Sequence, residues 1–167
     1  MAQFLALTGT ILSIDWQNMN SDQMGCSLNV TLLSQEQGTV NVIVSGYTYV
    51  LGSCPLNEGD EVTFFYSAMA PVPAIYPPQY QAVAAAHTPS GTFAALDTFT
   101  QAPNSTQLAN SDDSLRLNVS DNTLQMLPNG QPFGGQLSGK LLLVIYSATT
   151  RSMPPQTAPE MIVAFCQ

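Results

Sequence analysis

Glu61-Val-Thr-Phe-Phe-Tyr-Ser-Ala68 and Leu141-Leu-Leu-Val-Ile-Tyr-Ser-Ala148 are two similar stretches of this 167-residue chain, separated by an offset of 80 residues. Each contains a short, continuous apolar run rich in β-branched and aromatic side chains, which is typical of a strand covered on both faces. A Pro-rich loop and a further strand-like segment follow each of them, at residues 81–86 and 161–165. The two stretches are therefore predicted to be central strands.

Alternation of apolar and polar residues extends the β prediction to other parts of the chain. The apolar positions that recur with a period of two are Leu28, Val30 and Leu32, then Val40, Val42 and Val44, and then Leu115, Leu117 and Val119. Such a period places one face of each segment against a core. No amphipathic helical stretch of about 12 residues can be found, and the one helical feature expected is a short turn within residues 92–99. The pattern predicts an all-β fold.

The similarity of the two stretches suggests an internal repeat. At the offset of 80, Tyr66-Ser-Ala matches Tyr146-Ser-Ala, and at an offset of 75, Val44-Ser45 and Thr48 match Val119-Ser120 and Thr123. Because the identities are few, duplication and a shared β-strand composition both explain them. Under duplication, the chain divides into a β unit at residues 1–95, a linking loop at 96–113 and a second β unit at 114–167.

The first of these units has the features of a small barrel. Thr8-Gly-Thr-Ile-Leu-Ser-Ile14 opens a strand, and Leu56-Asn-Glu-Gly-Asp-Glu-Val62 leads into the central strand. A Gly-Thr-Ile opening strand and a Gly-Asp turn before a later strand resemble a five-stranded Greek-key barrel of the OB type. Other β-barrels and β-sandwiches fit the same pattern. The predicted fold class is therefore all-β, with small Greek-key or OB-like β-barrel units, and two related units in one compact chain if the repeat is real.

The chain carries little charge: three Lys and Arg residues and eleven Asp and Glu residues, for a net charge of −8. Charged residues make up 8% of the sequence, against about 25% in an ordinary soluble domain. A surface of uncharged polar groups resists self-association weakly, so a homo-oligomer or homopolymer is expected. The negative charge and the lack of a basic cluster argue against nucleic-acid binding. No run of about 18 apolar residues occurs, so no membrane span is predicted.

Two Pro-rich blocks follow the similar stretches: Ala70-Pro-Val-Pro-Ala-Ile-Tyr-Pro-Pro-Gln-Tyr80 and Thr149-Thr-Arg-Ser-Met-Pro-Pro-Gln-Thr-Ala-Pro159. Leu127-Pro-Asn-Gly-Gln-Pro-Phe133 lies between them. With these blocks, residues 5–165 resemble a poorly characterised β-domain family of Gram-positive, spore-forming anaerobes. The resemblance implies that lineage and an all-β fold, and it carries no catalytic or binding residues.

The first Pro-rich block contains a candidate contact site, made of Tyr76, Pro77, Pro78 and Tyr80. The two tyrosines and adjacent prolines could form an aromatic platform for a sugar or peptide, or for another subunit. The alternative, which we favour, is structural: the prolines fix an extended path and the tyrosines pack beneath it.

The chain has an odd number of cysteines, Cys26, Cys54 and Cys166. In an oxidising location, Cys26 and Cys54 could pair within a subunit and leave the penultimate Cys166 to cross-link a neighbour. The alternative is that all three remain reduced. Their spacing does not suit zinc, and no metal or other cofactor is predicted.

Residues with catalytic potential are sparse, so the chain is not expected to be an enzyme. His87 is the only histidine, and any Ser-His-Asp or Cys-His arrangement would need it. We expect it instead at the surface or at a strand end. The carboxylates Glu58, Asp60 and Glu61, and the pair Asp112 and Asp113, lack the EF-hand spacing. They are expected to be solvated loop residues, with weak calcium binding as the alternative.

Two classes of function remain. The first, which we favour, is a structural, self-assembling subunit of an extracellular or spore-surface filament or coat, formed by strand-edge addition or barrel stacking. The second is a soluble β-barrel binding module for carbohydrate or peptide that uses the Tyr- and Pro-rich loops. The expected location is extracellular or at the cell or spore surface. The sequence has no recognisable signal peptide, which agrees with a spore-surface location because spore-surface proteins are made in the mother cell and exposed after it lyses.

Overall fold

The computed structural model describes residues 2–17 and 22–166. The chain divides into two compact units, a first unit at Phe4–Ser90 and a second unit that contains residues 2–3 and the chain from Gly91 onward. Each unit contains its own seven-stranded sheet, and one short 3-10 turn, η1 (Leu51–Ser53), is found among the described residues. The predicted all-β fold with two related units is confirmed. The prediction of a helical turn within residues 92–99 is wrong, because Phe93–Gln101 forms a strand, β8.

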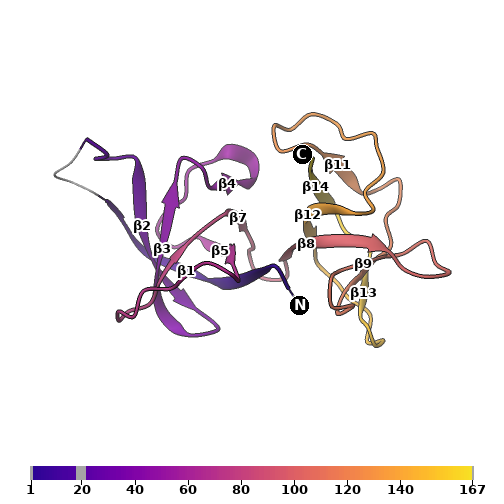
Figure 1. Ribbon diagram of the computed structural model, residues 1–167, viewed down its shortest axis with the longest axis horizontal. Helices are drawn as coiled ribbons and strands as arrows, with labels where there is room; N and C mark the ends of the chain where they lie inside the picture. The colour runs from indigo at the N-terminus through magenta and orange to yellow at the C-terminus, as the bar shows by residue number, and fades with distance from the viewer. Residues whose placement is uncertain (1, 18–21, 167) are drawn as a thin grey trace. The chain divides into compact units, whose positions relative to one another are not determined.

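The strands of the two sheets are labelled in Figure 1. In spatial order, the first unit contains β4 (Tyr49–Val50), β7 (Ala84–His87), β5 (Glu61–Ser67), β1 (Phe4–Trp16), β2 (Ser27–Ser34), β3 (Gly38–Ser45) and β6 (Gln79–Gln81). In the same order, the second unit contains β11 (Leu124–Met126), β14 (Met161–Phe165), β12 (Lys140–Tyr146), β8 (Phe93–Gln101), β9 (Leu108–Ala109), β10 (Arg116–Leu117) and β13 (Gln156–Thr157).

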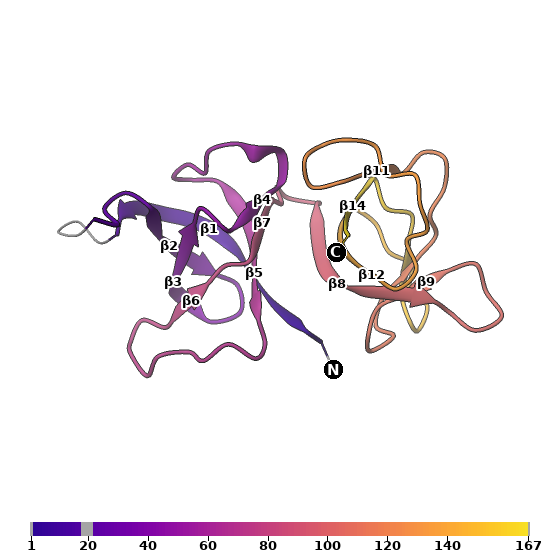
Figure 2. The same cartoon turned by 45° about the horizontal axis from the view of Figure 1, so that its top comes forward.

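The two sheets share one topology, since adding seven to each strand number of the first gives the order of the second. The strand directions agree as well. The β3–β6 and β4–β7 pairs are parallel, as are β10–β13 and β11–β14, whereas all other ladders are antiparallel. The two units are therefore structural repeats, and the strands of each curve around its own core in both views (Figure 1 and Figure 2).

A repeated turn shows that the sequence matches reflect the same local structure. Thr48 Oγ1 donates to the carbonyl of Ala82 at 2.8 Å, and Thr123 Oγ1 donates to the carbonyl of Pro159 at 2.8 Å. The backbone N–H of Thr48 donates to Ser45 and that of Thr123 to Ser120. The predicted match of these turns at the offset of 75 is confirmed.

The structure places the boundary between the units earlier than the sequence did. It falls between Ser90 and Gly91, and the predicted linking loop at 96–113 instead contributes most of β8 and all of β9. β8 pairs with β12 along seven residues, so it is a sheet strand rather than a connector. The Ser, Asn and Gln residues of this segment lie mainly in the turns on either side of β9.

Each unit buries a separate apolar core. Phe64, on β5, is 1% exposed in the first core, and Phe99, on β8, is fully buried in the second. β5 lies between β7 and β1, and β12 lies between β14 and β8, which confirms that the two similar stretches form interior strands. Closure of each sheet into an OB-like barrel stays a prediction. No helix within residues 2–17 or 22–166 has the length and apolar character to cross a membrane.

Candidate functional site

The two Pro-rich loops occupy equivalent places in the repeats. One joins β5 to β6 and the other joins β12 to β13, and each contains a cis peptide bond, before Pro77 and before Pro154. The N–H of Asn41 donates to the carbonyl of Pro78 at 2.8 Å, and the N–H of Arg116 donates to that of Pro155 at 3.0 Å. A Pro-Pro-Gln sequence follows at an offset of 77 in both loops, a repeat signal that the sequence interpretation missed.

A large apolar side chain points into solvent from the same position in both loops. Tyr76 is 90% exposed and Met153 is 92% exposed, each directly before its Pro-Pro-Gln sequence. Met69 and Ile75 are also exposed in the first loop, which extends beyond the strands of its sheet (Figure 2). Because large apolar side chains cost free energy in water, these loop tips favour contact with another surface.

Tyr80 does not join Tyr76 in an aromatic platform. Tyr80 lies on β6 and is buried, with its ring 4.5 Å from that of Tyr66 and its hydroxyl donating to Gln37 Oε1 at 2.6 Å. The favoured expectation that both tyrosines pack beneath the Pro-rich path therefore agrees with Tyr80, which packs in the core, and is wrong for Tyr76, so Tyr80 is not available as a contact residue. The half-buried Pro77 and Pro78 connect it to the exposed Tyr76.

A cluster of three polar side chains, missed by the sequence interpretation, lies in the first unit. Cys54 Sγ is 3.7 Å from His87 Nδ1, and His87 Nε2 is 2.9 Å from Asp60 Oδ2. The side chains of His87 and Asp60 are 33% and 25% exposed, and Cys54 is exposed. We call Cys54, His87 and Asp60 the thiol cluster. It places a nucleophile beside a base that a carboxylate orients.

The turn that carries Cys54 is shaped by the residues on either side of it. Gly52 and Ser53 adopt positive φ angles of 82° and 49°, the region in which glycine is at least cost. Cys54 is then extended, with φ −105° and ψ 153°, as expected for a residue before proline, here Pro55. This turn directs the thiol to the end of β7.

Strand register brings His87 and Asp60 together. His87 ends β7 and pairs with Val62 of β5, and Asp60 lies two residues before Val62 in the turn that leads into β5. Residues two apart on a strand share a face, so Asp60 is the diagonal neighbour of His87. The hydrogen bond from His87, together with one from the N–H of Asn57, holds the pKa of the Asp60 carboxyl below its usual value. Asp60 is therefore an ionised acceptor for the imidazole at neutral pH.

All three cysteines are free and exposed. The pairing of Cys26 with Cys54 is not formed, and Cys54 instead contacts the only imidazole of the chain. A cross-link between copies through Cys26, Cys54 or Cys166 stays a prediction.

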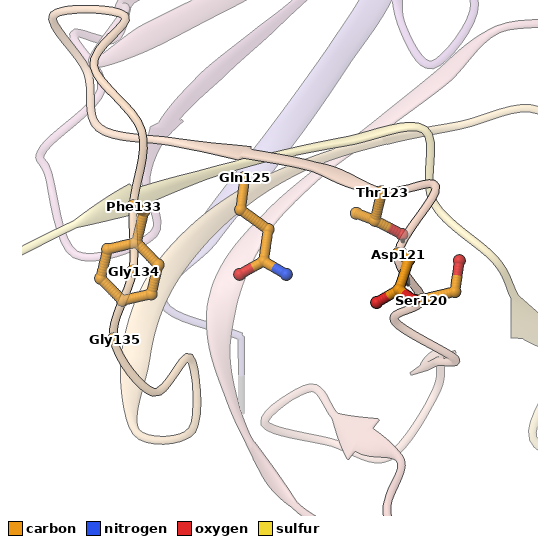
Figure 3. A pocket seen from close by; sticks show the side chains of 7 residues that line it. All are labelled: Ser120, Asp121, Thr123, Gln125, Phe133, Gly134 and Gly135. Atoms are coloured by element: carbon orange, nitrogen blue, oxygen red, sulfur yellow. Dashed lines mark hydrogen bonds between the residues drawn. The ribbon is translucent and has the colours of Figure 1, made fainter.

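A polar hollow of about 480 Å³ lies in the second unit. Figure 3 shows the Phe133 ring on one side, Ser120 and Asp121 on the other, and the Gln125 amide between them. Gly135 lies against the Phe133 ring, which a Cβ at that position would meet at 3.1 Å. Among the described residues, neither the Asp121 carboxylate nor the Gln125 amide makes a hydrogen bond, so both are available to a ligand.

The remaining carboxylates of interest have local partners. Asp113 accepts two hydrogen bonds from Arg116, at 2.9 and 3.0 Å, and Asp112 accepts one from Ser114 at 2.6 Å. Across residues 2–17 and 22–166, no group of three His, Cys, Asp or Glu side chains is placed to hold a metal ion.

Comparison of the sequence with known proteins found no matching family model and no matching curated protein.

Proposed function

We propose that the chain is a structural subunit that assembles with copies of itself, as part of an extracellular or spore-surface filament or coat. The observation that carries this proposal is the repeated presentation of a large apolar side chain, Tyr76 in one unit and Met153 in the other, at equivalent exposed loop tips. The low charge of the chain favours the same function, because little electrostatic repulsion opposes contact between copies.

Two association surfaces on one subunit support growth into a polymer. A surface used once closes a dimer, whereas contacts between two different surfaces generate rings or open filaments. The sheet edges are poor candidates for this contact, since β4, β6, β11 and β13 have only two or three residues each. Short edge strands limit edge-to-edge pairing. We therefore assign the contact to the loops rather than to strand addition.

Replacing both tips, Tyr76→Ser and Met153→Ser, is expected to convert a polymerising chain into a monomer. The two substitutions remove the apolar area proposed to drive the contact, and neither side chain contributes to a core. Sedimentation velocity and negative-stain microscopy of the full chain, under reducing conditions, measure the effect.

Tyr47→Ser is the matched control, because Tyr47 is 99% exposed in a turn outside the Pro-rich loops. It should polymerise as the native chain does. A native chain that remains monomeric at every protein concentration, or a double variant that polymerises normally, would contradict the proposal.

A second candidate function, binding of a neutral carbohydrate, is favoured by the hollow of the second unit. Ligand sites combine an aromatic surface with a few hydrogen-bonding groups, and the hollow offers the Phe133 ring with the Asp121 carboxylate and Gln125 amide. This site differs from the Tyr- and Pro-rich loops to which the sequence pointed.

Asp121→Ala is expected to weaken carbohydrate binding by at least about tenfold, because a hydrogen bond to a charged group is worth about 1.5–3 kcal/mol. The measurement is binding to an array of neutral oligosaccharides, followed by calorimetry with the best of them. Asn122→Ala is the control, since Asn122 is exposed beside the hollow without lining it. Equal affinities of the two variants would rule the hollow out as the binding site.

A further inference from the structure

We propose that Cys54 is a reactive thiol, activated by His87 and Asp60, that exchanges with a low-molecular-weight disulfide. This site is independent of the proposed assembly function, and none of its residues lies in the Pro-rich loops. The 3.7 Å contact between Cys54 Sγ and His87 Nδ1 and the 2.9 Å contact between His87 Nε2 and Asp60 Oδ2 carry the proposal.

The Asp60 carboxylate fixes the tautomer of His87, so that the ring nitrogen facing the thiol is the one that can accept a proton. An ionised carboxylate can only accept hydrogen bonds, so the His87 Nε2–H donates a hydrogen bond to Asp60 Oδ2. In the neutral ring, Nδ1 then holds the lone pair, and it is this atom that faces Cys54 Sγ. The cluster therefore presents an acceptor to the thiol proton and a negative charge that stabilises the imidazolium formed.

The repeat shows that the fold does not need these side chains. By register, Ala164 of β14 takes the place of His87, since Ala164 pairs with Leu142 as His87 pairs with Val62. Lys140 takes the place of Asp60, and the two residues donate equivalent backbone hydrogen bonds, to Leu137 and Asn57. The loop between β11 and β12 contains no cysteine. One topology thus folds with the cluster and without it, so a structural requirement does not explain it.

Atoms and electrons balance in an exchange between the Cys54 thiol and the disulfide, with no other reactant. The thiol proton of Cys54 passes to His87 Nδ1, and the thiolate attacks one sulfur of the disulfide. A new S–S bond forms at Cys54 as the old S–S bond breaks, and its electron pair leaves with the second sulfur. That leaving thiolate takes the proton from His87, which gives one mixed disulfide and one free thiol.

Single-cysteine forms of the full chain test the proposal, because the other two thiols are exposed and the chain has no second histidine to activate them. The chains are C26S/C166S, which keeps Cys54, and C26S/C54S, which keeps Cys166. Each is treated with glutathione disulfide over a range of pH, and intact-mass spectrometry follows the mixed disulfide.

Cys54 is expected to react about tenfold faster than Cys166 near pH 6.5, because His87 Nδ1 lies beside the thiol and accepts its proton as the sulfur attacks, whereas the chain has no second histidine to serve Cys166. The two rates should converge at about pH 9, where ordinary thiols ionise. Adding His87→Ala to the Cys54 chain should give it the pH profile of Cys166, and Asp60→Asn should lower its rate at neutral pH.

Superimposable pH profiles for Cys54 and Cys166 would overturn the proposal, and so would an unchanged rate after His87→Ala. The comparison of the single-cysteine chains alters no residue of the cluster in the chain that keeps Cys54. It therefore decides the matter even if His87→Ala fails to fold.

Discussion

Gly9→Ala is expected to destabilise the first unit by about 3 kcal/mol, in the upper part of the range for overpacked sites. Gly9 lies on β1 opposite Ser34 of β2. A Cβ at this position would meet the carbonyl carbon of Leu33 at 2.8 Å and the Cα of Ser34 at 2.9 Å, and it would also contact the Leu33 oxygen. These are backbone atoms of a paired strand, so the strand itself would have to move. Urea denaturation of the variant measures the loss.

Gly46→Ala is the matched control for this substitution. Nothing lies within 4 Å of a Cβ built at Gly46, which is not among the glycines with positive φ. The control should be neutral or slightly stabilising, because alanine restricts the unfolded chain. Equal unfolding midpoints for the two variants would show that β1 and β2 separate at little cost.

The strands were the most predictable part of this protein. The continuous apolar runs at Val62 and Leu142 form interior strands, and Val40, Val42 and Val44 are buried as their period of two required. Each of these signals is local, because it depends on which faces of one segment are covered. Linker boundaries were less predictable, since the polar composition after Gln101 belongs to turns that flank short strands.

The thiol cluster could not be predicted, although the sequence interpretation noted each of its parts. Cys54 was considered as a disulfide partner, Asp60 lies in the predicted Gly-Asp turn, and His87 was expected at the surface or at a strand end. What joins them is the register of β5 against β7 and the positive φ angles before Cys54. Register depends on packing between segments that are distant in the sequence, so local sequence patterns do not predict which residues of two strands lie opposite each other.

The repeat offers an internal comparison that separates structural residues from the others. Thr48 and Thr123 keep one hydrogen bond in both units, and the Pro-Pro-Gln segments keep one backbone path. Such agreements mark what the topology requires. The differences, His87 against Ala164 and Tyr76 against Met153, lie outside these shared contacts. The change from His87 to Ala164 removes a reactive side chain without changing the fold. The change from Tyr76 to Met153 keeps a large apolar side chain at the loop tip.

Phe64→Ala and Phe99→Ala are each expected to destabilise one unit by about 3–5 kcal/mol, the usual cost of removing a buried phenylalanine ring. Phe64 is 1% exposed in the first core and Phe99 is fully buried in the second. Because the cores are separate, each substitution should lower the stability of its own unit. Trp16, the only tryptophan, lies on β1 of the first unit, so its fluorescence reports that unit.

The test compares Trp16 fluorescence with far-ultraviolet circular dichroism, which records both units, during urea denaturation. Phe64→Ala should move the fluorescence transition to lower urea, whereas Phe99→Ala should leave it in place and shift only part of the dichroism signal. A fluorescence transition that moves equally in both variants would mean that the repeats unfold as one cooperative body. In that case the two units would unfold together in one transition, and a substitution in either core would destabilise both Pro-rich loops.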